Sequence, residues 1–528
     1  MKCDEGRPAC MKCISTGRVC EGYGVWGGGN TLDLVRPASI NQSLLRHVAP
    51  ESQDEHGFME WFRFRTAVKL QGPFGSQFWD TLVTRASLEE SSVFHAMLAL
   101  SSYHKRVYTG MAGAGPEEDP NGLELFTLRQ YNKAINDLQP HFSSRDKASL
   151  RVALVTCMVF ICLEFLRGRY KTGNIHLQNG IKLLAGLQGN LEQAVGPRNI
   201  LTRASINREP TDDWIIEAFT RMNLLAVQFG QGCWMSPNLH FSNHLSLPIT
   251  FESVAQARHC LDNMFNDIHH LGKRCRHEST LGGSIDYVPG QYLLDVQQRL
   301  RSHLTAWIKT YKSSRIGLQI QPDDISKVGY QLLFLYHIMA NILVDTSLRP
   351  YDEMAFDSHY HDFVSIITQS IKFLKEVQEF QSVENSKFKS GSELYFFNAD
   401  IGWIPPLYYT VLHCRVHHLR LRAIELLRTI PSREGIWDSV FAASVAQEVM
   451  RMEEEGHCND AQDINFLLPS DQLQDYDMNL PVLSSSRRFY DVQVDLPDSP
   501  LRKAVLTCKR KKDDGCYEVI TRDCVLDP

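Results

Sequence analysis

Apolar residues recur at helical spacing along most of the chain, from about residue 58 onward. One such stripe is formed, at intervals of three or four residues, by Leu125, Leu128, Tyr131, Ile135 and Leu138. This spacing places the side chains on one face of an α-helix. The pattern therefore predicts a helical body in which each helix buries one face.

A strongly apolar segment lies between Ala148 and Leu166 and is followed by Gly168, a residue type that often terminates helices. Its most apolar part, residues 152–163, is shorter than the roughly 20 residues that cross a bilayer. A second helical stripe follows, formed by Leu177, Ile181 and Leu184. The two segments predict a pair of buried antiparallel helices, and we expect no membrane span.

Near the C-terminus the apolar period changes to two. Apolar side chains alternate with polar ones at Tyr490, Val492, Val494 and Leu496, which is the pattern of a half-buried strand. The sequence therefore predicts a mainly α protein whose all-helical body is followed by a small β hairpin or sheet.

Two further strands are predicted on either side of Asp514-Gly515, a dipeptide typical of two-residue hairpin turns. A turn centred there places Cys508 opposite Thr521. We therefore expect no disulfide between Cys508 and Cys516.

The composition limits where nucleic acid could bind. The chain has 528 residues, enough for two or three domains, and its 43% apolar content is ordinary for globular proteins. Its 55 Lys and Arg against 61 Asp and Glu give a net charge of −6. A chain whose whole surface grips nucleic acid normally carries a positive charge. Any DNA contact is therefore expected in a small part of the chain.

The cysteines are expected to be reduced. Residues 1–5 lack the apolar core of a secretion signal, so we expect a protein that stays inside the cell. In a reducing compartment its 14 cysteines are buried thiols or metal ligands rather than disulfides.

Four cysteines lie in the first 20 residues, in the pattern C-x6-C-x2-C-x6-C formed by Cys3, Cys10, Cys13 and Cys20. Such dense thiolates in a segment without a local apolar core are suited to zinc, because the metal supplies the folding free energy. The alternative is four unrelated reduced cysteines. Four thiolates suffice to bind one zinc ion in tetrahedral geometry. The glycines at 27–29, which do not favour regular structure, indicate a linker after this segment.

The residues around these cysteines resemble the second half of the fungal binuclear zinc cluster. The resemblance is carried by the runs Lys2-Cys3-Asp4-Glu5-Gly6-Arg7-Pro8-Ala9-Cys10-Met11-Lys12-Cys13 and Gly17-Arg18-Val19-Cys20-Glu21-Gly22-Tyr23. In that family six cysteines hold two zinc ions, and a short basic helix reads a CGG-type triplet in the major groove. The resemblance implies that the four cysteines are the third to sixth ligands, with Cys10 bridging both metals.

The first two cysteines of the family pattern and most of its basic helix have no counterpart in this sequence. Lys2 alone matches the reading segment, while Lys12 and Arg18 are candidates for phosphate contacts. We expect Met1 to be an internal methionine of a longer protein. The alternative is a genuinely short protein that has lost DNA binding.

The helical body resembles the fungal-specific transcription factor domain that follows such clusters. The resemblance is carried by Leu163-Glu164-Phe165-Leu166-Arg167-Gly168, His176-Leu177-Gln178-Asn179-Gly180, Ile404-Pro405-Pro406-Leu407-Tyr408 and Arg433-Glu434-Gly435-Ile436-Trp437-Asp438. The expected organisation is a partial cluster at 1–24, a flexible linker at 25–57, the helical body at 58–480 and the β appendage at 481–528.

The resemblance implies a nuclear, zinc-binding transcription factor that contacts DNA and the transcription machinery and regulates fungal biosynthetic or metabolic genes. A helical interaction or effector-sensing regulator without DNA binding is the alternative. We expect no enzyme, because the sequence has no nucleophile elbow, phosphate loop or zinc-protease motif. Residues 21–60 show no sustained heptads, so we expect no coiled-coil dimerisation beside the cluster.

Three other groups of residues are interpreted without a special function. His413, His417 and His418 are expected on a solvated face rather than around a metal. The cysteines and histidines between Cys260 and His277 have irregular spacing, which favours chance clustering. The basic run at 509–512 is interpreted as a solvated turn, with a nuclear localisation signal or a phosphate contact as the alternative.

Overall fold

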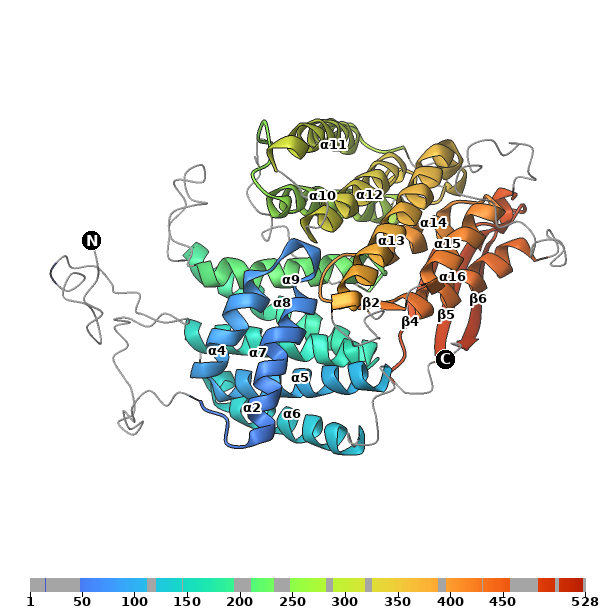
Figure 1. Ribbon diagram of the computed structural model, residues 1–528. Coiled ribbons are helices and arrows are strands. Elements are labelled where there is room, and N and C mark those ends of the chain that lie inside the picture. The colour runs from blue at the N-terminus through green and yellow to red at the C-terminus, as the bar shows by residue number, and fades with distance from the viewer. Residues whose placement is uncertain are drawn as a thin grey trace. The chain divides into compact units, whose positions relative to one another are not determined.

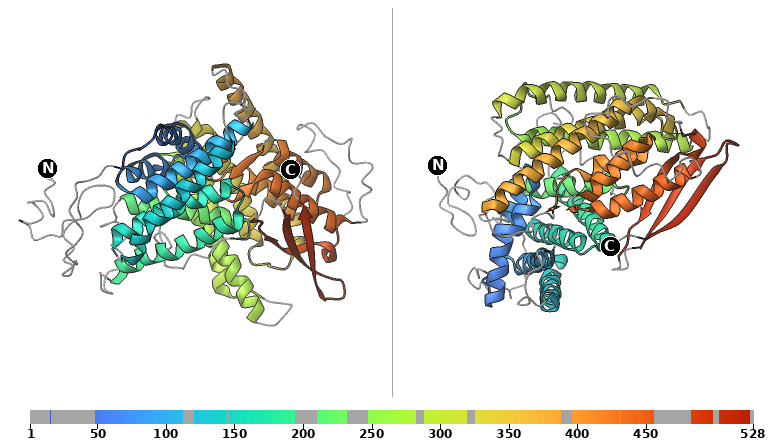
Figure 2. Two further views of the ribbon diagram at one scale, coloured as in Figure 1. Left: turned by 90° about the horizontal axis from the view of Figure 1, so that it is seen from below. Right: turned by 45° about the vertical axis from the view of Figure 1, so that its right-hand side comes forward.

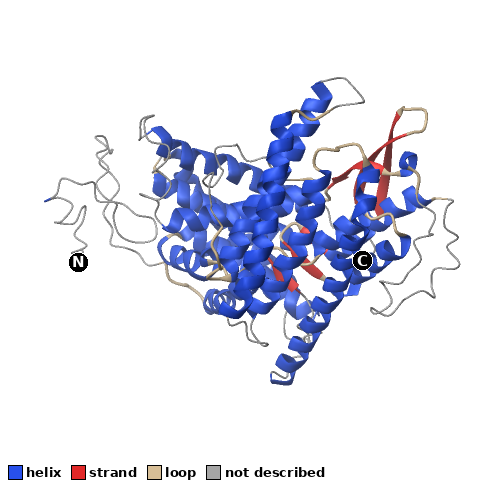
Figure 3. Cartoon of the chain, turned by 90° about the horizontal axis from the view of Figure 1, so that it is seen from above, coloured by secondary structure: helices blue, strands red, loops and turns tan. Residues whose placement is uncertain are grey.

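Helices dominate the computed structural model (Figure 3), so the prediction of a mainly α protein is confirmed. The structure describes residues 15, 48–111, 120–144, 146–193, 210–231, 247–281, 288–318, 325–387, 396–429, 431–455, 483–498 and 503–525. These residues form two compact units. Unit 1 comprises the described residues of 1–71, 76–167 and 172–220, and unit 2 those of 72–75, 168–171 and 221–528.

Unit 1 is built from helices alone among its described residues. The first, α2, begins at Gln53 because the Ser52 side chain accepts a hydrogen bond from the Glu55 amide and caps the helix. The other elements that lie wholly or mainly in this unit are η1 (Phe62–Thr66), α3 (Ala67–Leu70), η3 (Phe78–Leu82), α4 (Val83–Glu89), α5 (Ser91–Met111), α6 (Pro120–Ser143), α7 (Lys147–Leu166), α8 (Tyr170–Gln193) and α9 (Pro210–Gln228).

Helix α7 forms the centre of unit 1 and packs against α5 and α6. Its side chains are buried on nearly every side, as expected of the most apolar segment in the chain. The helix is long and apolar enough to span a membrane, but 94% of the relevant window is buried inside the protein. The same test selects residues 327–346, of which 67% is buried. Gly168 follows α7 at φ +74°, as its predicted role in terminating the helix requires.

Helices α7 and α8 contact each other in antiparallel order, as predicted. Cys157 Sγ donates to the His176 carbonyl at 3.3 Å. A Cβ atom at Gly173 would meet the Phe165 ring at 2.5 Å, so glycine allows this close approach. Later residues of α8 therefore contact earlier residues of α7.

Helix α6 confirms the predicted helix and buries Leu138 of the predicted stripe, but the first half of the helix buries other residues. Leu125 and Leu128 are 49% and 36% exposed, whereas Thr127 and Gln130 are buried. Thr127 hydrogen-bonds to the Ser102 hydroxyl at 2.8 Å, and Gln130 donates to Glu55 at 3.0 Å. These polar side chains can be buried because they find partners, which apolar periodicity does not reveal.

Unit 2 begins with a helical layer and ends with a sheet (Figures 1 and 2). Helices α10, α11 and α12 pack on one another, α13 packs on α12, and α14, α15 and α16 form a second group. The helical elements are η2 (Gly72–Phe74), α10 (Val254–Leu281), α11 (Gln291–Gly317), α12 (Ile325–Thr346), η5 (Glu353–His359), α13 (Tyr360–Lys387), α14 (Ile404–His413), α15 (His417–Thr429), α16 (Ser439–Glu454) and η8 (Ser485–Arg487).

A three-stranded sheet interrupts the helices of unit 2 and was not predicted. Its strands are β1 (Phe396–Asn398), β2 (Ser432–Glu434) and β3 (Trp437–Asp438). Strand β1 pairs with β2 in parallel, and β2 pairs with β3 in antiparallel order around Gly435, which has φ +58°. The body is therefore not all-helical, and strands of two or three residues are too short to show an alternating pattern.

The predicted C-terminal β appendage is present as a sheet of β4 (Phe489–Asp495), β5 (Lys503–Lys511) and β6 (Tyr517–Val525), in the order β4-β5-β6. The hairpin loop is one residue longer than predicted. The Lys512 amide donates to the Cys516 carbonyl, and the Gly515 amide donates to the Lys512 carbonyl. This is the three-residue loop in which glycine occupies the left-handed position, here φ +83°.

The longer loop shifts the register of the hairpin by one residue. Cys508 lies opposite Ile520 rather than Thr521. Cys508 is buried on the inner face of the sheet, whereas Cys516 is exposed in the loop, and both are free thiols.

Candidate functional site

The site residues predicted from the sequence all lie outside the described residues. These are the four proposed zinc ligands and the three proposed DNA contacts, namely Cys3, Cys10, Cys13, Cys20, Lys2, Lys12 and Arg18. The predicted cluster at 1–24, apart from residue 15, and residues 25–47 of the predicted linker fall in the same part of the chain. The last residues of the predicted linker, 53–57, instead form the start of α2. The zinc and DNA assignments stay predictions.

In the part of the chain that the structure describes, no three His, Cys, Asp or Glu side chains converge as a metal site. The Nδ1 atom of His417 lies 2.6 Å from Oε2 of Glu454. His413 contacts another carboxylate, with its Nδ1 atom 3.5 Å from Oε2 of Glu353. The histidines on α14 and α15 therefore belong to separate ion-pair contacts.

The cysteines of α10 are protonated thiols. Burial raises the pKa of both Cys260 and Cys275 to about 11. A thiol with such a pKa carries almost no thiolate near neutral pH, and thiolate is the form that attacks substrates.

One group of buried charges in unit 2 centres on Arg258 of α10. Its Nε donates to both oxygens of Asp262, one helical turn later, at 2.9 and 2.8 Å. Its Nη1 lies 2.5 Å from Oδ1 of Asp400, in the segment before α14. Asp400 also accepts from Arg221 of α9 at 3.1 Å. Two cations and two carboxylates thus form one neutral chain of ion pairs.

An aromatic ring also contacts Arg258. The guanidinium stacks over the Phe74 ring, 4.5 Å from its centre, and the Arg258 side chain is fully buried. Burial by itself lowers the pKa of Arg258, but Asp262 and Asp400 outweigh it and raise that pKa. Burial raises the pKa of Asp262 against the attraction of Arg258. These ions therefore depend on one another to stay charged.

A buried carboxylate holds the start of α14. Glu434 of β2 accepts hydrogen bonds from the amides of Trp403 and Ile404 at 2.9 and 3.2 Å. These amides belong to the first turn, where helices have unpaired donors and a positive dipole end. A Cβ atom on Gly402 would lie 2.1 Å from a Glu434 oxygen, so this approach requires glycine. Burial nevertheless raises the Glu434 pKa to about 8.

The run Arg433 to Asp438, which carried part of the family resemblance, forms this β2-β3 turn. Gly435 supplies the positive φ, and the Trp437 indole donates to the Leu225 carbonyl at 3.0 Å. The Trp437 ring meets Phe229 edge-on, with 4.5 Å between ring centres. The motif is therefore structural, because it joins the sheet to α9 and α14 within unit 2.

A second ionic network lies between α15 and α16. Arg420 and Glu453 are both fully buried and are 2.7 Å apart. Arg415 lies 3.0 Å from the other oxygen of Glu453 and 2.9 Å from Glu353. Glu453 also accepts from the Phe489 amide at 2.8 Å, which fixes the start of β4. The network thus connects the helices to the C-terminal sheet.

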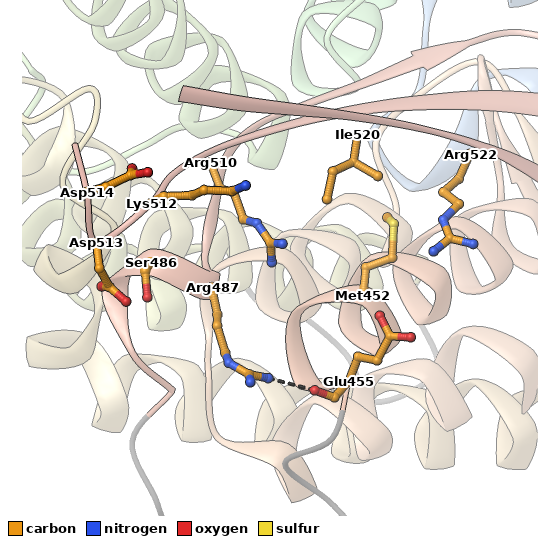
Figure 4. Close-up of a pocket in the computed structure, with 10 residues that line it drawn as sticks. All are labelled: Met452, Glu455, Ser486, Arg487, Arg510, Lys512, Asp513, Asp514, Ile520 and Arg522. Atoms are coloured by element: carbon orange, nitrogen blue, oxygen red, sulfur yellow. Dashed lines mark hydrogen bonds between the residues drawn. The ribbon is translucent and has the colours of Figure 1, made fainter. Parts of the chain in front are cut away.

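A pocket of about 550 Å³ opens between the end of α16, η8 and the β5-β6 hairpin (Figure 4). The guanidinium groups of Arg510 and Arg522 lie on either side of Met452, and Arg487 donates to the Glu455 carbonyl at 2.7 Å. The full lining is Met452, Glu455, Ser486, Arg487, Arg510, Lys512, Asp513, Asp514, Ile520 and Arg522. Its cations and carboxylates nearly balance, so the pocket does not select strongly for anions.

The basic run at 509–512 is paired with acids rather than collected into a patch. Lys509 lies 2.9 Å from Asp491, while Arg510 and Lys512 lie 2.6 and 2.9 Å from Glu518. Lys509 to Lys511 lie in strand β5 and Lys512 begins the hairpin loop, so most of the run belongs to a strand rather than to a turn.

Sequence reasoning missed the buried ionic residues, which connect elements far apart in the sequence. Arg258 and Asp262 stand four residues apart, a spacing that equally describes a surface ion pair. Asp400 lies two residues before Gly402, and Glu434 lies directly before Gly435. A Cβ atom added to either glycine would come within 3 Å of a neighbouring side chain, so the backbone is crowded at both positions. In the sequence, the signal that could have indicated these buried carboxylates was an acidic residue close to a glycine.

Comparison with known proteins identifies the family to which the helical body belongs. Residues 64–446 match the family described as the fungal specific transcription factor domain. The chain is 22% identical over 547 aligned positions to the aspercryptin biosynthesis cluster-specific transcription regulator atnN of Emericella nidulans, covering 87% of each chain. It is 28% identical over 194 positions to transcription regulator lscL of Purpureocillium lilacinum, covering 35% of this chain and 46% of that one. No solved structure matches.

The family match covers more than half of the chain and includes most of the helices described above, together with the ion pairs of Arg258. Both relatives are transcription regulators rather than enzymes, in agreement with the expectation from the sequence. The chain belongs to the fungal specific transcription factor domain family and is a fungal transcription regulator.

Proposed function

We propose that this regulator is a nuclear zinc-cluster factor that controls a biosynthetic or metabolic gene set in a fungus. The observation that carries the proposal is the C-x6-C-x2-C-x6-C pattern, which stands on the N-terminal side of a family body at 64–446. The relative from Emericella nidulans, which is similar over 87% of this chain, is named for a biosynthesis cluster.

In the proposed cluster Cys3, Cys10, Cys13 and Cys20 bind zinc as thiolates. Lys2 contacts base edges, and Lys12 and Arg18 contact phosphates. Phosphate contacts position a protein on DNA, while side chains at base edges supply the discrimination between sequences. Three cations give salt-dependent binding with little discrimination.

Metal analysis of the purified full chain tests the zinc proposal. We expect about one zinc per chain, held by four thiolates, and loss of that zinc in Cys13→Ser. Cys516→Ser is the matched control, because Cys516 is exposed in the β5-β6 loop and is a free thiol. Zinc-free wild-type protein, or equal zinc in both variants, would contradict the assignment.

Gel-shift titrations test the DNA proposal. The chain is expected to bind a CGG site weakly and with little preference over a scrambled site. A variant that carries the family's first half of the cluster in front of Lys2 is expected to bind the CGG site tightly. Binding by the shorter chain with full discrimination would show that the reading surface lies elsewhere. Absence of both zinc and DNA binding in either form would instead favour an interaction or effector-sensing regulator.

A further inference from the structure

The outer edge of the C-terminal sheet is formed by strand β6. Among the described residues, β6 pairs with β5 on one side only. The strand is nine residues long, and Tyr517 and Val519 are 53% and 58% exposed. Long edge strands with exposed aromatic and β-branched side chains readily add another strand.

The hairpin loop determines which backbone groups face the open edge. Lys512 bonds to Cys516 across the end of the hairpin, and the same register continues to Cys508 opposite Ile520. Hydrogen-bonded pairs alternate along an antiparallel ladder, so Ile520 directs its amide toward β5. The amides and carbonyls of Val519 and Thr521 therefore point away from the sheet.

The side chains of β6 are complementary to a second copy of the same strand. Two antiparallel β6 strands centred on Ile520 place Glu518 opposite Arg522 of the other copy, and Arg522 opposite its Glu518. Residues 519 and 521, whose backbones face outward, then pair with each other. A shift by two residues leaves both charges without an opposite partner, so the charges select one register.

The charges on the edge have unequal partners within one chain. Glu518 already lies near two cations, Arg510 and Lys512. Arg522 is exposed and makes no ion pair with a described residue. In the symmetric register each Arg522 gains a carboxylate at a position where opposite side chains approach most closely.

We propose that the chain forms a homodimer by antiparallel pairing of β6 with β6 of a second copy, with Ile520 at the two-fold axis. The two C-terminal sheets then become one continuous sheet across the interface. Such an interface is isologous, because the same residues contribute from both copies. It is independent of the zinc cluster and of any DNA.

Sedimentation velocity of the full chain tests the proposal. We expect a dimer of the 60.3-kDa chain whose population rises with concentration. Hydrogen exchange at residues 517–525 should slow as the dimer forms. The proposal would be overturned if the wild-type chain stayed monomeric as its concentration was raised and hydrogen exchange at residues 517–525 did not slow.

Thr521→Pro is the first variant, because it removes an amide that faces the open edge and leaves the amides facing β5 intact. We expect it to be monomeric, while Thr521→Val, which keeps the amide, remains dimeric. A dimer that survives Thr521→Pro would place the interface elsewhere.

Charge reversal supplies a second test if the proline variant fails to fold. Arg522→Glu and Glu518→Arg each put like charges opposite each other, and each is expected to weaken self-association by about tenfold. Mixed together, the two variants restore both opposite-charge pairs and should form a heterodimer. If the Arg522→Glu variant self-associates as strongly as the wild-type chain, the assigned register is wrong.

Discussion

Helix α7 of unit 1 and helix α10 of unit 2 are both long and central, but they bury apolar and charged side chains in different proportions. Helix α7 is mostly apolar between its ends, with Leu154 and Leu163 fully buried, and its buried Arg151 pairs with one carboxylate. Helix α10 buries the ion pair of Arg258 and Asp262, which continues to further buried ions. The first core therefore depends mainly on shape and transfer from water, and the second depends more on matched charges.

This difference determines how each unit should respond to change. An apolar core loses stability in proportion to the cavity that a truncation leaves. An ionic core loses more when one partner is removed, because the remaining charge stays buried without compensation. Matched charges also fix which residues of α9, α10 and the segment before α14 lie together in unit 2.

The largest effect is expected from Arg258→Met. Removal of the guanidinium leaves Asp262 and Asp400 without their shared cation, and the free energy of unfolding should fall by about 3–5 kcal/mol. Arg274→Met is the matched control on the same helix. Arg274 pairs with Glu278 at the same spacing but is 59% exposed, so we expect a change below about 0.5 kcal/mol. Urea titrations followed by circular dichroism measure both, and equal losses would show that burial does not increase the effect of removing one partner of an ion pair.

Leu163→Ala tests the apolar core of unit 1. The side chain is fully buried in α7, and its truncation should cost about 2–5 kcal/mol. Leu125→Ala on α6 removes the same atoms from a side chain that is 49% exposed, and should cost less than about 1 kcal/mol. The same urea titration compares them. A large loss at Leu125 would mean that its exposed face is covered in solution.

Gly435→Ala tests the β2-β3 turn in unit 2. The residue has φ +58°, and an added Cβ would lie 2.9 Å from Leu225 and 3.0 Å from Met222. Strain and crowding together should cost about 2–4 kcal/mol. Gly515→Ala has a similar φ of +83° but no neighbour within 4 Å, so backbone strain of about 1 kcal/mol is expected. Thermal melts of the two variants separate crowding from strain, and equal shifts would show that crowding adds nothing.

A pH dependence of stability is expected from Glu434. Burial raises its folded-state pKa to about 8 from an ordinary value of 4.5. The folded state therefore holds this proton more tightly than the unfolded state, and the associated stability declines as the pH rises from 4.5 toward 8. Glu434→Gln keeps an oxygen for the α14 amides but cannot ionise, so its melting temperature should depend less on pH across that window. Parallel profiles for wild type and variant would exclude Glu434 as a contributor.

Sequence periodicity predicted the elements that are long and have one chemical character. Helix α7, the stripe of α8 and strand β4 were found because their apolar residues repeat over several turns or pairs. Strands β1, β2 and β3 were missed because two or three residues cannot show a period. The buried faces of α6 and α10 were hidden by polar residues that are satisfied only through distant partners, such as Gln130 with Glu55.

The functional residues also differ in how far the sequence could reveal them. The cysteine pattern was visible because metal ligands have a characteristic spacing within one short segment. The ionic residues were invisible because Arg221, Arg258 and Asp400 lie far apart in sequence and meet only after folding. The spacing of residues in the sequence can reveal metal ligands that lie in one segment, but it cannot reveal an ionic network whose residues come from three separate segments.

The short element η2 has a consequence for dissecting this regulator by deletion. Residues 72–75 belong to unit 2, where Phe74 lies under the Arg258 guanidinium and Gly75 accepts a hydrogen bond from Arg221. A truncation that removes the first 75 residues as a dispensable leader therefore also removes part of the core of a unit formed mostly by residues beyond 220. During synthesis, too, that core must wait for Asp400 to leave the ribosome. The linear map of this regulator is consequently a poor guide to the places where it can be cut.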